Sequence, residues 1–120
     1  SQVQKNGHCL CGKVGVNAKA VNVEVHACHC NMCQLWNGGP TLSAHCGTDV
    51  SFTNEEYISI YPSCSWAELG FCKNCGSHLF YRSTESGEYI IQTGTFDSAE
   101  GFSLNQQIFI DEKPAFYSFA

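Results

Sequence analysis

The sequence predicts a mainly β protein with little helix. Apolar residues occupy alternate positions at Val21, Val23, Val25 and Ala27, which is the period of a strand buried on one face. The other apolar runs are short and are separated by clusters of Gly, Asn, Asp, Ser or Pro, which favour turns. Because the helix candidates are also short, strands must organise the fold.

The strands follow from short runs of β-branched and aromatic residues between these turn clusters. In chain order they are predicted at Gly12–Asn17, Val21–Ala27, Thr41–His45, Val50–Thr53, Tyr57–Tyr61, Trp66–Phe71, His78–Arg82, Tyr89–Thr93 and Gln107–Ile110.

Two single helical turns are predicted between the strands. One follows Cys30 and ends at Trp36, before the Gly-Gly-Pro sequence at 38–40, which suits either a turn or a mobile lip. The other is suggested by Thr53 and Glu56, which have the spacing of a capping box. Neither is long enough to determine the architecture.

Size and charge restrict the function. The 120 residues make one domain, 1–120, and 6 Lys+Arg against 11 Asp+Glu give a net charge of −5. Charged residues are 14% of the sequence and hydrophobic residues 43%, which indicates a folded chain. The cations are scattered and form no basic stripe for nucleic acid, so a small molecule or a protein is the expected partner.

The sequence also indicates a compartment. No apolar run is long enough to span a membrane, and the first residues lack the basic and apolar regions of a signal peptide. We therefore expect a cytoplasmic protein with no membrane partner. In a reducing compartment, an odd total of nine cysteines indicates metal binding or catalysis rather than a disulfide framework.

Most of the cysteines fall into three tight groups: Cys9-Leu-Cys11-Gly, Cys28-His-Cys30-Asn-Met-Cys33 and Cys72-Lys-Asn-Cys75-Gly. Two thiolates one or two residues apart on a turn can point at one cation, and a following glycine permits the turn. A structural zinc site has four protein ligands, whereas a catalytic one has three and an open position. These counts predict a structural zinc on the two outer pairs, Cys9/Cys11 and Cys72/Cys75, and a catalytic zinc on Cys28, Cys30 and Cys33.

A different partition would make a zinc ribbon from Cys30/Cys33 and Cys72/Cys75. The intervening residues 34–71 exceed the usual ribbon spacing of about 15–20 residues. This partition would also leave Cys28 to share a site with Cys9 and Cys11. We therefore prefer the partition into one four-cysteine site and one three-cysteine site.

The three-cysteine group could instead be a second structural site, closed by a fourth ligand. The candidates for this ligand are His29, His45, Cys46 and Cys64. His29 lies between two ligands, and on an extended chain its side chain projects away from them, so a hydrogen-bonding or surface role suits it better. Cys46 and Cys64 are expected to be buried as small hydrophobes, with a redox role as the alternative.

Five segments carry a family resemblance. They are Gly7-His-Cys-Leu-Cys-Gly-Lys-Val14, Cys28-His-Cys-Asn-Met-Cys-Gln34, Phe71-Cys-Lys-Asn-Cys-Gly-Ser-His-Leu-Phe80, Thr93-Gly-Thr-Phe-Asp97 and Lys113-Pro-Ala-Phe-Tyr117. In order and spacing these segments resemble the landmarks of the glutathione-dependent formaldehyde-activating enzyme family. The resemblance covers nearly the whole chain.

The resemblance implies an Mss4-like fold, in which small coiled antiparallel β-sheets are stitched together by zinc. The activity it implies is that of a carbon–sulfur lyase or synthase acting on a thiol–aldehyde adduct, typified by S-hydroxymethylglutathione formation from glutathione and formaldehyde. It also implies two zinc ions, a structural one at Cys9, Cys11, Cys72 and Cys75 and a labile or catalytic one at Cys28, Cys30 and Cys33.

One departure from the family concerns the substrate. Members close to the glutathione enzyme have basic residues after the third cysteine of the triple, where this chain has Gln34-Leu35-Trp36. Since glutathione is anionic, the loss of a cation beside the metal removes an anchor. The resemblance therefore predicts fold and metal, and leaves the thiol and the aldehyde open.

Zinc with three thiolates is a weak Lewis acid, so we expect the site to bind a substrate thiol and help it ionise for attack on an aldehyde. The candidates for a general base are His29, His45, His78 and Asp97. The candidates for an aromatic pocket wall are Trp36, Trp66, Phe71 and Phe80, although such residues more often belong to the core.

Two other functions match part of the pattern. A methionine sulfoxide reductase of similar fold would need a separate catalytic cysteine, and the C-terminal part has no Arg-x-Cys-x-Asn segment to supply it. A non-catalytic zinc module that binds another protein needs no three-thiolate site. The uneven third cysteine group therefore favours an enzyme.

Overall fold

The computed structural model describes residues 2–119 and contains two β-sheets. The small sheet has the order β1-β2-β5 and the large sheet the order β10-β3-β4-β9-β8-β7-β6. The strands are β1 (Gln2–His8), β2 (Gly15–Asn22), β3 (Glu24–Cys28), β4 (Thr41–Gly47), β5 (Val50–Thr53), β6 (Ile58–Cys64), β7 (Ala67–Cys72), β8 (His78–Ser83), β9 (Tyr89–Gln92) and β10 (Ser103–Ile108).

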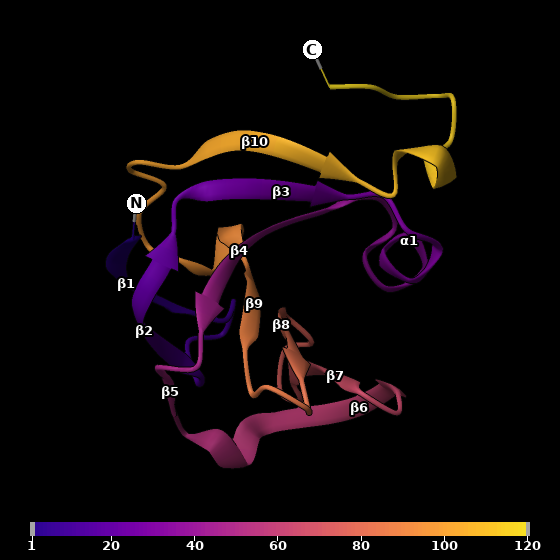
Figure 1. Ribbon diagram of the computed structural model, residues 1–120. Helices are drawn as coiled ribbons and strands as arrows, with labels where there is room; N and C mark the ends of the chain where they lie inside the picture. Colours follow the sequence, from indigo (N-terminus) through magenta and orange to yellow (C-terminus); the bar gives the residue numbers. More distant parts are fainter. Residues whose placement is uncertain (1, 120) are drawn as a thin grey trace.

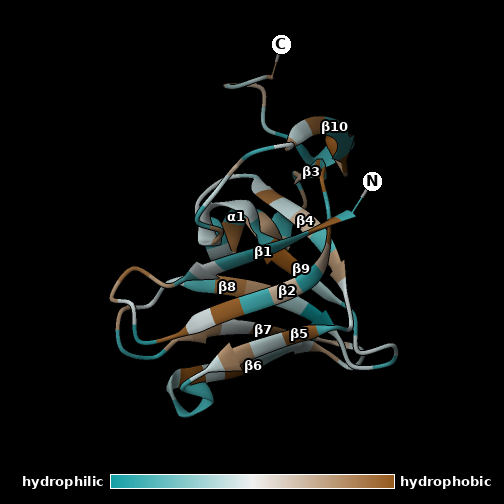
Figure 2. Ribbon diagram, turned by 90° about the vertical axis from the view of Figure 1, so that its left-hand side faces the viewer, coloured by the Kyte–Doolittle hydropathy of each residue, from teal (hydrophilic) through white to brown (hydrophobic). Residues whose placement is uncertain are grey.

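The small sheet lies across one face of the large sheet, as Figure 2 shows for β1, β2 and β5. The side chains between them form the core. It includes Val14, Val16 and Val21 from the side of the small sheet and Leu79 and Ile91 from the large sheet, all nearly excluded from solvent. Burial of these aliphatic groups is the main favourable term that holds the two sheets together.

The large sheet has two different faces because successive side chains of a strand point in opposite directions. On β4, Ala44 and Cys46 point into the core, whereas Ser43 and His45 line a cavity on the other face. On β9, Ile91 belongs to the core and its neighbours to the cavity. One sheet therefore supplies both the core and a pocket.

The mainly β prediction is confirmed, but the prediction of a single strand over Val21–Ala27 is wrong. β2 ends at Asn22 and β3 begins at Glu24, and the two strands belong to different sheets. The alternation of apolar residues continues through the break because both strands bury one face.

Two strands depart from the prediction in other ways. β1 was not predicted, since Val3 is the only large apolar residue in Gln2–His8; pairing with β2 defines this strand. β10 begins earlier than Gln107 and pairs with β3 in parallel, within an otherwise antiparallel sheet. Figure 1 shows the two strands running side by side in one direction.

The helical segments are short. The predicted turn after Cys30 is α1 (Asn31–Asn37), with Gly38 in the left-handed conformation that ends it. The 3₁₀ turns are η1 (Glu55–Tyr57), η2 (Thr93–Thr95) and η3 (Ile110–Glu112). Across residues 2–119 no helix has the length and apolar character needed to cross a membrane.

The predicted capping box at Thr53 and Glu56 is wrong in detail. η1 forms there, but its N-cap is Asn54, which is in the left-handed conformation and makes no side-chain cap. The Thr53 hydroxyl instead accepts a hydrogen bond from the Gly15 amide at 2.9 Å. The Thr53 hydroxyl, which the local pattern assigned to a helix cap, is therefore used where β5 pairs with β2.

A test of the core packing is the substitution Gly70→Ala on β7, at the position paired with Phe80 of β8 in the same sheet. A Cβ at this position would overlap the ring of Phe80, which is only 3% exposed. We expect a loss of about 1–3 kcal/mol in the free energy of unfolding, because a packed core cannot absorb an added methyl group. Urea titration followed by circular dichroism measures this loss.

The matched control is Gly39→Ala, where no atom lies within 4 Å of the added Cβ. Its effect should stay within about 0.5 kcal/mol of wild type. Equal stability of Gly70→Ala and wild type would contradict the packing described for Phe80.

Candidate metal centres and the adjoining cavity

The first candidate metal centre is the group Cys9, Cys11, Cys72 and Cys75, whose Sγ atoms all lie within 4.8 Å of one another. The Sγ atoms of Cys9 and Cys11 are 3.6 Å apart, and those of Cys11 and Cys72 are 3.8 Å apart. Zinc–sulfur bonds of about 2.3 Å at tetrahedral angles separate two sulfurs by roughly 3.8 Å. The group therefore has the dimensions and the donors of a four-thiolate zinc site.

Two similar turns bring these cysteines together. The amide of Gly12 donates to the Cys9 carbonyl at 3.1 Å, and the amide of Gly76 donates to the Cys72 carbonyl at 2.7 Å. Both glycines have φ near +80°, a conformation that other residues rarely adopt. Each turn therefore needs a glycine immediately after its second cysteine.

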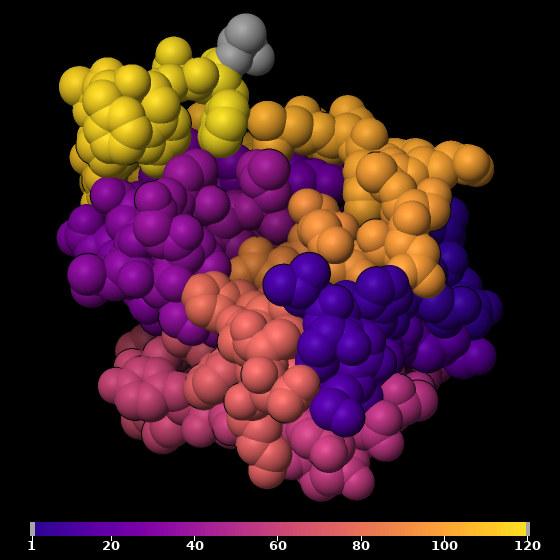
Figure 3. Space-filling model, turned by 180° about the vertical axis from the view of Figure 1, so that it is seen from behind, coloured from indigo at the N-terminus to yellow at the C-terminus, as the bar shows by residue number. Residues whose placement is uncertain are grey.

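The two turns connect the sheets. The first follows β1 of the small sheet and the second follows β7 of the large sheet. The Leu10 amide donates to the Ser77 hydroxyl at 2.9 Å, so the turns contact one another directly. In Figure 3 they are the indigo and salmon regions that meet on this face of the molecule.

Hydrogen bonds favour the thiolate form of Cys11 and Cys75, whereas burial raises the pKa of Cys72. The Val14 amide donates to Cys9 Sγ at 3.3 Å. A hydrogen bond from the Ser77 hydroxyl is the main cause that lowers the pKa of Cys75 to about 5, and the Asn74 side chain lowers the pKa of Cys11. These donors compensate negative charge on sulfur, which metal binding requires.

The second candidate metal centre is the group Cys28, Cys30 and Cys33, whose sulfurs also lie within 4.8 Å of one another. Cys28 ends β3, Cys30 is the N-cap of α1 and Cys33 is a buried residue of that helix. The Cys33 amide donates to Cys30 Sγ at 3.3 Å, and the two sulfurs are 3.2 Å apart. The strand end and the cap thus orient three donors toward one point.

Burial raises the pKa of both Cys28 and Cys33 above that of a free thiol. Without a cation, these two sulfurs are protonated at neutral pH, because a thiolate would lose its hydration there. A soft divalent cation such as zinc would displace these protons and supply the missing charge.

The three-cysteine group lines a cavity of about 360 Å³ on the outer face of the large sheet. α1, the turn between β6 and β7, and residues 108–109 complete its walls. In Figure 1 the sheet curls from β3 to β6, so that α1 and the turn between β6 and β7 lie at the same side of the molecule. This size is within the range of small-molecule sites.

The candidates for a fourth ligand do not join the triple. Within residues 2–119, the sulfur cluster contains only Cys28, Cys30 and Cys33. Of the two roles expected for His29, the hydrogen-bonding one is confirmed and the surface one is wrong: the residue is fully buried, and its ring nitrogens contact the Tyr117 hydroxyl at 2.8 Å and the Gln107 side-chain oxygen at 2.9 Å. The zinc-ribbon partition also lacks support, since the structure separates its two cysteine pairs.

The two remaining cysteines have different environments. Cys46 is buried in the core, as expected, and burial raises its pKa to about 12. The expectation that Cys64 is also buried is wrong: it is exposed and lines the cavity. Its position at the end of β6, next to an exposed turn, explains the difference.

Of the four candidate bases, His45 is the one that lines this cavity. Burial is the main cause that lowers its pKa, which keeps the imidazole neutral at pH 7. Its ring packs edge-on against His26, with centroids 4.8 Å apart. His26 was not among the predicted site residues, although its place two residues before Cys28 puts both side chains on one face of β3.

The other candidate bases are engaged elsewhere. His78 Nδ1 contacts the Asn37 side-chain oxygen at 2.7 Å, and its ring stacks on Trp36. Asp97 lies 3.3 Å from the exposed His8 ring. His78 and His8 line a wider, open depression of about 750 Å³ that contains none of the three cysteines.

The aromatic candidates divide between cavity and core. Trp36 and Trp66 line the cavity, whereas Phe80 is buried in the core and Phe71 lies outside the cavity wall. Phe109, which was not among the predicted wall residues, is half-exposed at the cavity wall and has a left-handed backbone with φ of 55°.

Comparison with known proteins supports the fold and identifies the family. A crystal structure of a Rhodobacter sphaeroides protein superposes with a TM-score of 0.69 and 18% identity, over 85% of this chain and 98% of that one. A protein of Schizosaccharomyces pombe named as an uncharacterized lyase is 34% identical over 115 residues, which are 95% of this chain and 84% of the relative. The profile of the glutathione-dependent formaldehyde-activating enzyme family matches residues 4–112. The chain therefore belongs to the glutathione-dependent formaldehyde-activating enzyme family.

Proposed function

We propose that this protein is a zinc-dependent carbon–sulfur lyase that splits, and in reverse forms, the adduct of a thiol and an aldehyde. The observation that carries the proposal is the three-cysteine group at the wall of a cavity large enough for a small molecule. The name of the S. pombe relative, a lyase, and that of the family, which activates formaldehyde with glutathione, support this reaction class.

The two cysteine groups have separate roles in the proposal. Cys9, Cys11, Cys72 and Cys75 hold a structural zinc, since four thiolates complete a tetrahedral shell. Cys28, Cys30 and Cys33 would hold a catalytic zinc at the cavity wall, and as three ligands they would leave one coordination position for a substrate. A zinc ion with such a position lowers the pKa of a thiol and stabilises its thiolate.

The reaction itself needs no oxidant. In the adduct R–S–CH(OH)–R′, the carbon–sulfur bond breaks and its electron pair stays on sulfur. The hydroxyl O–H pair becomes the second bond of the carbonyl, and the released proton passes to a base. We assign this role to His45, because it is neutral at pH 7 and lines the same cavity as the three sulfurs.

The structural zinc is tested by Cys72→Ser. A structural zinc contributes on the order of 10 kcal/mol in small zinc domains, which is comparable with the whole stability of a typical domain. We expect the variant to hold one metal per chain at most and to lose cooperative unfolding. Metal analysis and urea titration followed by circular dichroism measure both.

The matched control is Cys46→Ser, because Cys46 and Cys72 are equally buried, at 0% exposure, and only Cys72 is in a cysteine group. This control should keep both metals. A Cys72→Ser protein that stays soluble, holds two metal ions per chain and unfolds cooperatively would contradict the assignment of a structural zinc to the outer pairs.

The difference between the two sites is tested by graded chelation. The triple has one protein ligand fewer and opens to a cavity that a chelator can enter, so its metal should leave first. Metal content per chain should fall from two to one before the far-ultraviolet circular dichroism changes. Simultaneous loss of both metals, or a complete protein shell around Cys28, Cys30 and Cys33 in an anomalous-scattering map, would contradict the catalytic assignment.

The activity is tested by exchange NMR between formaldehyde and several small thiols, with glutathione among them. Wild type should accelerate exchange above the spontaneous rate, and Cys30→Ser should return it to that of buffer while the fold is retained. His45→Gln should lower the rate by about 10²-fold. Because burial lowers the pKa of His45, the wild-type rate should persist below pH 6.5 and then fall as the imidazole is protonated.

The control for this series is again Cys46→Ser, which alters a cysteine outside the cavity. Identical rates for wild type, Cys30→Ser and buffer with every thiol would refute catalysis and favour a non-catalytic zinc module.

A further inference from the structure

We infer that the substrate of this site is an uncharged adduct with an apolar, ring-sized organic group, and not an anionic thiol such as glutathione. This inference rests on the function proposed above and concerns which thiol–aldehyde adduct the site accepts. It depends on two observations, the apolar wall of the cavity and the positions of the cations, and on the charge that a zinc ion held by three thiolates would have.

Much of the cavity wall is apolar. It is formed by side chains from α1, the central strands, the turn between β6 and β7, and the segment after β10, chiefly Met32, Trp36, Trp66, Leu69, Ile90 and Phe109. An organic group of the size of a benzene ring fits a cavity of about 360 Å³.

Three of these side chains remain accessible. Met32 is 37% exposed, and Trp66 and Phe109 are each 53% exposed. Large apolar side chains that gather around a cavity, rather than singly on a surface, are typical of a ligand site. The left-handed backbone of Phe109, which costs energy in a residue with a Cβ, holds one of these rings at the site.

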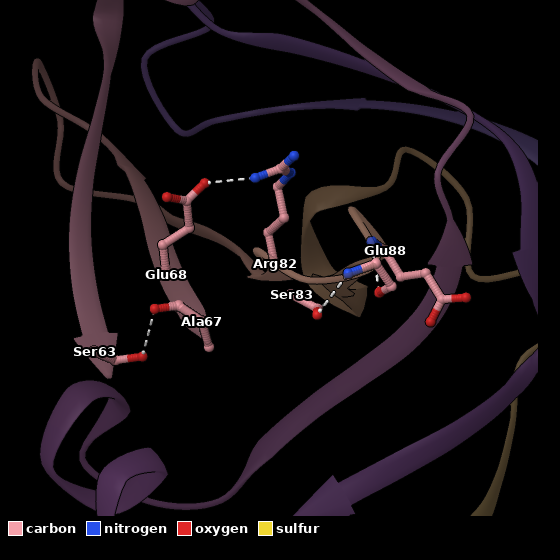
Figure 4. A network of polar contacts seen from close by, with 7 residues as sticks. Ser63, Ala67, Glu68, Arg82, Ser83 and Glu88 are labelled. Atoms are coloured by element: carbon pink, nitrogen blue, oxygen red, sulfur yellow. Dashed lines mark hydrogen bonds and ion pairs between the residues drawn. The ribbon is translucent and has the colours of Figure 1, made fainter. Parts of the chain in front are cut away.

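No Lys or Arg side chain lines the cavity, although all six lie within residues 2–119. Three of them are held elsewhere by specific contacts. Lys5 donates to the carbonyls of Ser98 and Glu100, and Lys113 to the carbonyl of Pro114. Arg82 is paired with Glu68 at 3.0 Å, as Figure 4 shows.

A carboxylate in this cavity would therefore lose water without gaining a cation. Three thiolates around a divalent ion would also leave a net charge of −1, which repels an anionic group that does not itself bind the metal. The polar side chains of the wall, such as Ser43 and Gln92, can orient a hydroxyl group but cannot neutralise a carboxylate. The site thus disfavours a negatively charged substrate and favours a substrate with an apolar group.

The test compares two thiols that differ by one charge, phenylmethanethiol and 4-(mercaptomethyl)benzoate, with glutathione as a third. Trp36 and Trp66 are the only tryptophans of the chain and both line the cavity, so tryptophan fluorescence reports binding independently of turnover. Metal content is checked at each thiol concentration. The metal-loaded protein should bind the neutral thiol at least tenfold more tightly than either anionic one, and exchange its formaldehyde adduct fastest.

A pair of variants locates the discrimination. Met32→Lys places a cation at the cavity wall and should bring the two aromatic thiols to within about twofold of each other. Leu35→Lys adds the same charge to the same helix at a position that is 89% exposed and away from the cavity, and it should retain the wild-type preference. Circular dichroism verifies that both variants fold. If one variant does not fold, the relative affinities of the wild-type protein for the neutral and the anionic thiols decide the inference.

The outcomes separate the two proposals. Equal or tighter binding of the carboxylate or of glutathione by wild type overturns the substrate class, while accelerated exchange with those thiols leaves the lyase proposal intact. Tight binding of the neutral thiol without accelerated exchange of any adduct supports the apolar site and refutes the lyase proposal.

Discussion

The seven-stranded sheet has two faces with different surroundings, and the rest of the structure depends on this constraint. Alternate residues of β4 and β9 enter either the core beneath the small sheet or the cavity on the opposite face. The core face carries aliphatic groups such as Ala44 and Ile91, and the cavity face carries Ser43, His45 and Gln92. A shift of one residue in register would exchange these two sets and lose both the core and the cavity.

The cysteine groups have different relations to this sheet. The outer pairs lie on turns that follow β1 and β7, so a metal ion bound by all four cysteines would join the small sheet to the large one across a long stretch of sequence. A domain of this size buries a limited core, and a cross-link between its sheets adds stability where the apolar area is small. The triple lies instead where β3 meets α1, at the wall of the cavity, which is consistent with a role in chemistry.

The distribution of charge is the basis of the selectivity that we infer for the cavity. The cations of the chain are few, and those with specific contacts satisfy backbone carbonyls or pair with a carboxylate, as Lys5 and Arg82 do. Residues 34–36, which follow the triple, also have other roles: Gln34 donates to the carbonyls of His29 and Glu112, Leu35 is exposed, and Trp36 lines the cavity. Family membership alone would suggest glutathione, but these particular side chains favour a neutral substrate.

The sequence by itself determined the mainly β class, most strand positions, the helical turn after Cys30 and the division of the cysteines into tight groups. These features depend on residues close in the chain, since turn glycines, thiol spacing and apolar alternation act locally. Only the tertiary structure decided that Val21–Ala27 crosses between two sheets, that β10 pairs in parallel with β3, and that the Thr53 hydroxyl bonds to Gly15 rather than capping a helix. It also decided that His26, Cys64 and Phe109 share a cavity with the triple. Those outcomes depend on strand order and on which face of a strand meets which neighbour, and residues far apart in the sequence fix both.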